Sequence, residues 1–249
     1  MQINNEDRQN LQKSFRNLTL FTRKLARVDV EDLPAQIQGP LIFACNHRSL
    51  SDLLIAGPTF FQWGEPIRAL VAASYFEHPL IGPLLRSLKC IPVQGLEAID
   101  QAREALNNGW SIAIMPEGRV VPRAEWLERG VSKGHIGIGK LAVETGFPVV
   151  ASGASGSELL WPRGKYLPFM KPWNRQHVVL RCEYLGVIDE KTPRDATDLI
   201  MEGVYDQGIF KAVFLMGGPG SGKSTVVERL ALKPLGLKLV NTDKAFEVV

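Results

Sequence analysis

The sequence predicts an α/β protein with a mostly parallel central sheet flanked by helices. Short apolar runs alternate along the chain with segments in which apolar residues recur every three or four positions. The runs are typical of buried strands and the spaced segments of amphipathic helices, and their alternation favours parallel strands covered on both faces. Hydrophobic residues make up 45% of the 249 residues, which is enough for one sizeable core. Ligands of such a sheet gather at the carboxyl ends of its strands.

The first element is an amphipathic helix over residues 8–28, within an N-terminal segment that we bound at residues 1–30. Lys and Arg side chains line one face of this helix. Two interpretations remain open, because the apolar stripe either covers the α/β core or lies on an anionic membrane surface. The apolar residues of the stripe are Leu11, Phe15, Leu18, Phe21, Leu25 and Val28.

Residues 31–206 are predicted to form the main domain. Its strands are the apolar runs at 40–45, 67–72, 88–93, 111–115, 148–152 and 177–185.

Segments with helical spacing separate these strands, and Gly109 and Gly146 supply stops after two of them. The predicted helices cover about residues 51–61, 78–88, 97–108, 135–145 and 195–205.

A second unit is predicted over residues 209–249, where an apolar run precedes the sequence GGPGSGKST at residues 217–225. In a P-loop the glycines let backbone N–H groups wrap a polyphosphate, while a lysine reaches the terminal phosphates and a hydroxyl binds Mg²⁺. Because 41 residues are fewer than a kinase domain needs, we interpret them as a truncated β-α-β P-loop unit, for which binding of Mg-ATP stays open. The predicted nucleotide-binding residues are Gly217, Gly220, Gly222, Lys223, Ser224 and Thr225.

A catalytic site is predicted where the run 40–45 ends, at the sequence NHRSLSD of residues 46–52. An imidazole at this position suits a general base near neutral pH, and a carboxylate on its other ring nitrogen fixes the tautomer and stabilises the imidazolium. His47 and Asp52 are the candidate pair. A surface histidine beside a helix-capping Asp52 is the alternative. A Cys45 nucleophile is a further alternative, although strand alternation favours Cys45 as a core residue.

Three further blocks follow this motif in order, namely IPV at 91–93, MPEGR at 115–119 and FPVV at 147–150. Together the four blocks resemble the glycerolipid acyltransferase family, in particular the 1-acylglycerol-3-phosphate acyltransferase group. The resemblance covers about residues 30–205 and implies a glycerol-3-phosphate acyltransferase-like fold. It implies an O-acyltransferase of phospholipid biosynthesis that moves a fatty acyl group from acyl-CoA or acyl carrier protein to a lysophospholipid such as 1-acylglycerol 3-phosphate.

The resemblance also implies roles for individual residues. His47 would be the general base and Asp52 would orient it, so that acyl transfer needs no cofactor. Arg119 is the candidate ligand of the acceptor phosphate. The other predicted substrate-binding residues are Asn46, Glu117, Gly118, Arg123 and Lys133.

Two departures from the family pattern leave the acceptor open. Arg119 follows Gly118 directly, where the family has Thr and then Arg. Gln94 and Gly95 follow Pro92-Val93, where the family has an Arg. Lysophosphatidic acid, glycerol 3-phosphate and other lysolipids therefore all remain candidates.

Composition restricts the classes of binding partner and the cellular location that we expect. A net charge of +3 does not indicate a nucleic-acid partner for the first domain. Cys45, Cys90 and Cys182 lie far apart in apolar runs, which favours reduced core thiols, and no metal site is expected in the acyltransferase domain. Since we find neither a signal segment nor a long apolar span, we expect a cytoplasmic protein, peripheral on the inner face of the membrane.

Two other functions stay open at this point. One is an ATP-dependent P-loop kinase of a small molecule or polynucleotide end, with the front domain as an accessory. The other is a lipid-binding scaffold whose His47 and Asp52 are inactive.

Overall fold

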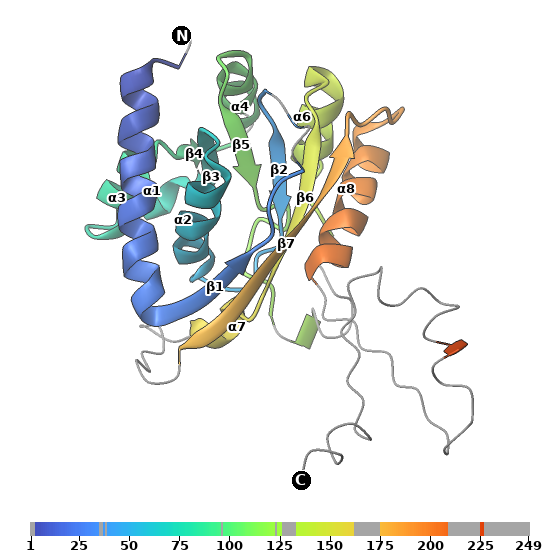
Figure 1. The fold of residues 1–249 in the computed structure, drawn as a ribbon. Coiled ribbons are helices and arrows are strands. Elements are labelled where there is room, and N and C mark those ends of the chain that lie inside the picture. Colours follow the sequence, from blue (N-terminus) through green and yellow to red (C-terminus); the bar gives the residue numbers. More distant parts are fainter. Residues whose placement is uncertain are drawn as a thin grey trace. The chain divides into compact units, whose positions relative to one another are not determined.

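The computed structural model describes residues 3–34, 37, 39–95, 97–122, 124–125, 133–161, 175–208 and 225–226. The chain divides into two units, Met1–Ile209 and Phe210–Val249. The first unit is a seven-stranded sheet with helices packed on it (Figure 1), which confirms the predicted α/β class. Of the predicted P-loop residues only Thr225 is described, as an exposed helical residue, and the others lie outside the described residues. Nucleotide binding therefore stays a prediction.

The sheet has the strand order β1-β7-β6-β2-β5-β3-β4. All neighbouring strands are parallel except β6 and β7, so β1 and β7 run against the other five. Strand β2 is central and its first three residues are fully buried. The strands are β1 (Ala26–Val30), β2 (Ile42–Cys45), β3 (Ile67–Ala72), β4 (Ile91–Val93), β5 (Ser111–Ile114), β6 (Val149–Ser155) and β7 (Gln176–Gly186).

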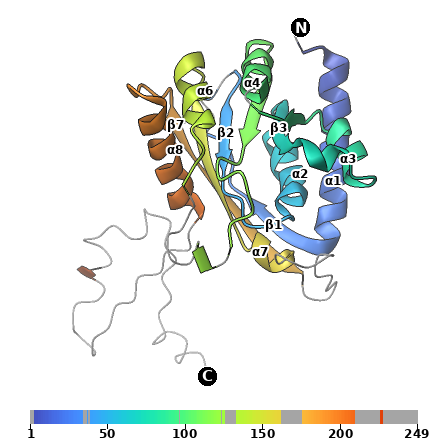
Figure 2. The same cartoon turned by 180° about the vertical axis from the view of Figure 1, so that it is seen from behind.

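Two helical layers cover the sheet. Helix α2 packs on one face, where Trp63 stacks on Phe43 of β2, and α1 packs on α2. Helices α4, α6 and α8 lie together on the other face, as the view from behind shows (Figure 2). The helices are α1 (Asn5–Leu25), α2 (Asp52–Trp63), η1 (Ala73–Phe76), α3 (Ile81–Ser87), α4 (Glu97–Asn107), α6 (Gly137–Thr145), α7 (Ser157–Leu160) and α8 (Pro193–Gly208).

The predicted end of the first helix at Val28 is wrong. Helix α1 ends at Leu25, and Ala26–Val30 forms the edge strand β1, in which Val28 pairs with Val178. The physical reason is that the sequence ARVDV alternates apolar and polar residues, as a half-buried strand does. Val28 fits both the helical spacing and this alternation, so periodicity alone did not separate them.

Helix α1 uses most of its apolar stripe to cover the core. Leu11, Phe15, Leu18 and Leu25 are buried, and the Phe15 ring meets that of Phe60 of α2 edge to face at 5.4 Å. The stripe therefore belongs to the fold. Among the described residues, no helix has the combined length and apolarity that a bilayer crossing requires.

Close contact between α1 and α2 depends on Gly57. A Cβ at this position would lie 2.7 Å from Cγ of Leu18. We expect Gly57→Ala to lower the free energy of unfolding by about 1–3 kcal/mol, because overpacking forces the two helices apart. Denaturant unfolding followed by circular dichroism measures this effect. An unchanged midpoint would contradict the tight α1–α2 packing.

Candidate active site

The candidate site begins where central strand β2 ends. Beyond Cys45, the Asn46 side chain takes over the pairing with β6. Its Nδ2 donates to the carbonyl of Ala154 at 3.0 Å, and the Ala154 N–H donates to its Oδ1 at 2.8 Å. This side-chain rung fixes the point at which His47 leaves the carboxyl end of the sheet.

His47 and Asp52 form the predicted pair, with Nδ1 of the histidine 2.8 Å from Oδ2 of the aspartate. The same oxygen accepts the backbone N–H groups of Arg48 at 2.9 Å and Ser49 at 3.0 Å. Asp52 starts α2, where the positive end of the helix favours a carboxylate. When Nδ1 carries the proton donated to Asp52, Nε2 keeps its lone pair, as a general base requires.

The two members of the pair differ in exposure. The Asp52 side chain is 4% exposed and that of His47 is 22% exposed. The carboxylate is thus enclosed by the turn that it holds together, while the imidazole reaches solvent. This arrangement allows a substrate to approach the ring without contacting the group that orients it.

Glu117 holds the backbone of His47 in place. Its Oε2 accepts the His47 N–H at 2.6 Å, and the Val121 N–H donates to the His47 carbonyl at 2.9 Å. The loop after β5 that supplies these groups turns at Gly118, whose φ of 65° suits glycine. Glu117 is 2% exposed and Asn46 is 1% exposed, so both predicted substrate-binding residues are buried.

Arg48 is a buried residue of the turn that the sequence analysis did not select. It is 5% exposed, and burial lowers the pKa of its guanidinium, while the carboxylates of Glu117, Glu158 and Asp52 act in the opposite direction. The arginine therefore offsets negative charge that the fold gathers around the turn. An arginine three residues after a buried strand was the signal available in the sequence.

Serine hydroxyls tie the turn to the segment after β6. Ser51 Oγ donates to the carbonyl of Ser157 in α7 at 2.8 Å, and Ser51 N–H donates to Ser49 Oγ at 3.0 Å. Ser49 Oγ donates in turn to the carbonyl of Trp161 at 2.7 Å. Both serines are completely buried, so these hydrogen bonds hold the turn against the segment after β6 inside the protein.

The predicted phosphate ligand Arg119 lies on the same loop as Glu117 but is exposed. Its Nη2 makes an ion pair with Glu125 at 2.7 Å. Lys133 is also exposed, and Arg123 lies outside the described residues. His135, which the sequence analysis did not select, packs on Gly118, where a Cβ would lie 2.7 Å from the imidazole.

The three cysteines are poorly ionised thiols. Burial raises the pKa of Cys45 to about 11, and its Sγ lies 2.8 Å from Ser152 Oγ. Burial likewise raises the pKa of Cys90 to about 11 and that of Cys182 to about 12. The thiolate is the nucleophilic form, so this environment does not favour Cys45 as the nucleophile. Among the described residues no cluster of potential metal ligands occurs.

A histidine hydrogen-bonded to an aspartate, at the carboxyl end of a central strand, is an arrangement suited to general-base activation of a hydroxyl in group transfer. The family model described as Acyltransferase matches residues 7–154. This match covers more than half of the chain, which therefore belongs to the acyltransferase family.

The fold is also similar to a crystal structure, that of the 1-acyl-sn-glycerophosphate (LPA) acyltransferase PlsC from Thermotoga maritima. The TM-score is 0.58 at 19% sequence identity, and the match covers 84% of this chain and 81% of that chain. At this identity the likeness concerns the fold. The search of curated proteins gave no match.

Replacing Glu117 tests its support of His47. We expect Glu117→Leu to lower kcat about 10- to 100-fold, because a hydrogen bond to a charged group contributes about 1.5–3 kcal/mol. Glu117→Gln keeps an acceptor oxygen, so its kcat should fall less than that of Glu117→Leu. Steady-state kinetics on protein whose folded fraction is known from circular dichroism measures this. Wild-type kcat in the leucine variant would contradict the supporting role.

Proposed function

We propose that this acyltransferase transfers a fatty acyl group from acyl-CoA or acyl carrier protein to the free hydroxyl of a lysophospholipid, with 1-acylglycerol 3-phosphate as the first candidate acceptor. The proposal rests on the bond between His47 Nδ1 and Asp52 Oδ2 at the end of β2. The four sequence blocks support this acceptor class, as does the fold similarity to a 1-acyl-sn-glycerophosphate acyltransferase. The reaction would serve phospholipid biosynthesis.

In the proposed mechanism His47 acts twice. Its Nε2 takes the proton from the acceptor hydroxyl as the oxygen attacks the thioester carbonyl, and Asp52 stabilises the imidazolium that forms. The new C–O bond gives a tetrahedral oxyanion. Its collapse breaks the C–S bond, and the imidazolium returns its proton to the leaving thiolate. The balance is one ester formed and one thiol released, and no cofactor is needed.

The acceptor head group is proposed to bind beside the loop of residues 117–119. Arg119 is half exposed there, and the side chain of His135 lies against Gly118. A phosphate would compete with Glu125 for the Arg119 guanidinium, since both are anions that accept hydrogen bonds from it. Lys133, which is exposed two residues before His135, adds positive charge nearby in the sequence.

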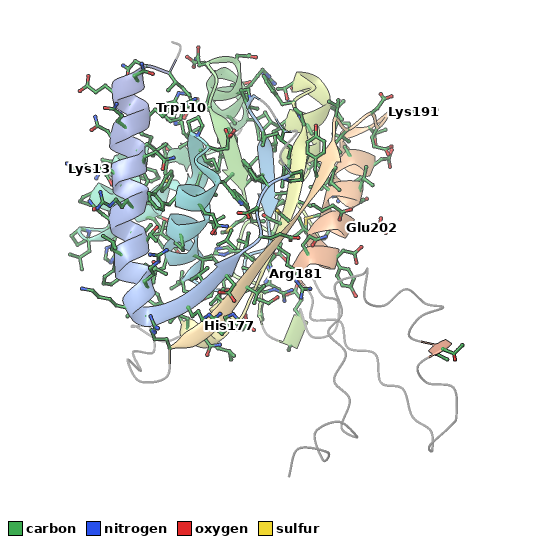
Figure 3. All side chains as sticks on the ribbon, in the orientation of Figure 1. Lys13, Trp110, His177, Arg181, Lys191 and Glu202 are labelled. Carbon is green, nitrogen blue, oxygen red and sulfur yellow. The ribbon has the colours of Figure 1, made fainter. Side chains whose placement is uncertain are left out.

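An acyltransferase assay tests the function. Purified protein is incubated with labelled acyl-CoA or acyl carrier protein and a panel of lysolipids and glycerol 3-phosphate, and thiol release and products are measured. We expect His47→Ala to lower kcat at least about 100-fold, because general-base catalysis contributes 10²–10⁴-fold. His177→Ala is the matched control, since this exposed histidine pairs with Asp29 at the β1–β7 edge (Figure 3). Wild-type turnover in His47→Ala would contradict the proposal.

We further propose that α1 and the start of α3 contact the inner face of the membrane. Leu20 and Phe21 of α1 are each 51% exposed, and Leu80, directly before α3, is 81% exposed. Phe21 and Leu84 line one groove between the two helices. Basic side chains of α1 are exposed as well, and Lys13 lies on the outer side of the helix (Figure 3). Exposed apolar residues flanked by cations suit an anionic lipid surface.

Vesicle binding tests this surface. We expect Leu20→Asp/Phe21→Asp to weaken binding to phosphatidylglycerol vesicles at least about tenfold, because each large apolar side chain contributes about 1.5–3 kcal/mol when buried. Turnover of a monomeric short-chain acceptor should remain. Tyr205→Asp on α8 is the control, as this residue is 37% exposed on the opposite face of the sheet. If vesicle binding weakens equally in both variants, or weakens in neither, the result contradicts an α1 docking surface.

A further inference from the structure

The C-terminal end of α8 lies directly against the catalytic turn. A Cβ on Gly208, the last residue of α8, would lie 2.9 Å from Nδ2 of Asn46 and 3.7 Å from a terminal nitrogen of Arg48. The Gly208 carbonyl accepts a hydrogen bond from Ser155 Oγ of β6 at 3.3 Å. The helix end therefore touches the two residues that flank His47 in the sequence.

Glycines allow α8 to approach the sheet this closely. On β6, a Cβ at Gly153 would lie 2.2 Å from the backbone nitrogen of Gly208. Five residues before the end of α8, a Cβ at Gly203 would lie 2.9 Å from the Cβ of Ala151. Gly139 of α6 allows a close approach at the start of α8, since a Cβ at Gly139 would lie 2.0 Å from the carbonyl oxygen of Pro193. The helix is thus seated at its start, middle and end.

Contact with Asn46 matters because its side chain carries both hydrogen bonds that join the turn to β6. Both polar groups of its amide already bond Ala154, and the residue is 1% exposed. A displaced amide would break the rung that fixes where His47 leaves the sheet. In addition, the negative end of the α8 dipole lies beside the Arg48 guanidinium, which favours its charged state.

We infer that Gly208 and Gly153 are positioning residues for acyl transfer. By leaving room for the last turn of α8 against Asn46, they hold the His47 imidazole in line with Asp52. The inference rests on the proposed role of His47 as the base. It assigns to α8, which is far from the motif in the sequence, a part in aligning the catalytic pair.

A comparison of two alanine variants in the same helix tests this inference. Gly208→Ala crowds Asn46, whereas Gly203→Ala crowds Ala151 by a similar amount away from the turn. We expect Gly208→Ala to lower kcat at least about tenfold with KM changed less than about threefold, because a misplaced base weakens mainly the transition state. Gly203→Ala should lose stability but keep kcat per folded molecule within about twofold of wild type.

A spectroscopic measurement separates alignment from general loss of stability. The Nδ1 proton of His47, bonded to Asp52, should give a downfield proton NMR signal that His47→Ala removes. We expect this signal to shift or vanish in Gly208→Ala and to persist in Gly203→Ala. Should Gly208→Ala fold poorly, Ser155→Ala removes only the hydroxyl that bonds the Gly208 carbonyl, and it should lower kcat severalfold and shift the signal.

The outcomes divide clearly. An unchanged signal and kcat in Gly208→Ala, or in Ser155→Ala when the former does not fold, would overturn the inference. An equal loss of kcat per folded molecule in Gly203→Ala would overturn it too. If the wild type transfers no acyl group, the proposed function fails, yet the His47 signal in these variants still decides whether the end of α8 aligns the pair.

Discussion

A single carboxylate oxygen organises this site. Oδ2 of Asp52 bonds Nδ1 of His47 and accepts hydrogen bonds from the backbone N–H groups of Arg48 and Ser49. It therefore fixes the imidazole tautomer, the shape of the turn and the first residue of α2 together. Burying a carboxylate costs free energy, and hydrogen bonds to its charged form offset that cost. Glu117, Asn46 and the serines act on the turn that this oxygen defines.

The sheet constrains the position of His47 more than that of the proposed head-group ligands. Strand β2 lies between two parallel neighbours and is covered on both faces, so its carboxyl end is among the most constrained points of the fold. Arg119 and Lys133, by contrast, lie exposed outside the regular elements. A site of this kind keeps one chemistry while head-group recognition changes with a few exposed side chains.

The sequence revealed more of the fold than of the detailed site. Apolar runs located six of the seven strands, because a buried parallel strand needs continuous apolar residues, while the edge strand β1 was not separated from the end of the predicted helix. The pair His47 and Asp52 stood out by spacing. The direction in which each side chain points was not visible in the sequence. Asn46 and Glu117 were predicted to bind substrate; both side chains are buried and bonded to distant backbone groups, and their contact with substrate stays a prediction. Gly208 carried no local signal at all, because its importance arises from a tertiary contact with Asn46.

The weakly acidic thiols have a practical consequence. With pKa values raised to about 11 or 12, all three native cysteines are almost fully protonated at neutral pH and react slowly with alkylating reagents. A fluorophore could then be attached selectively at an introduced thiol, for example in Leu80→Cys, whose position is 81% exposed. The wild-type cysteines would not need to be removed, so the proposed contact of this position with lipid could be measured in an otherwise unaltered protein.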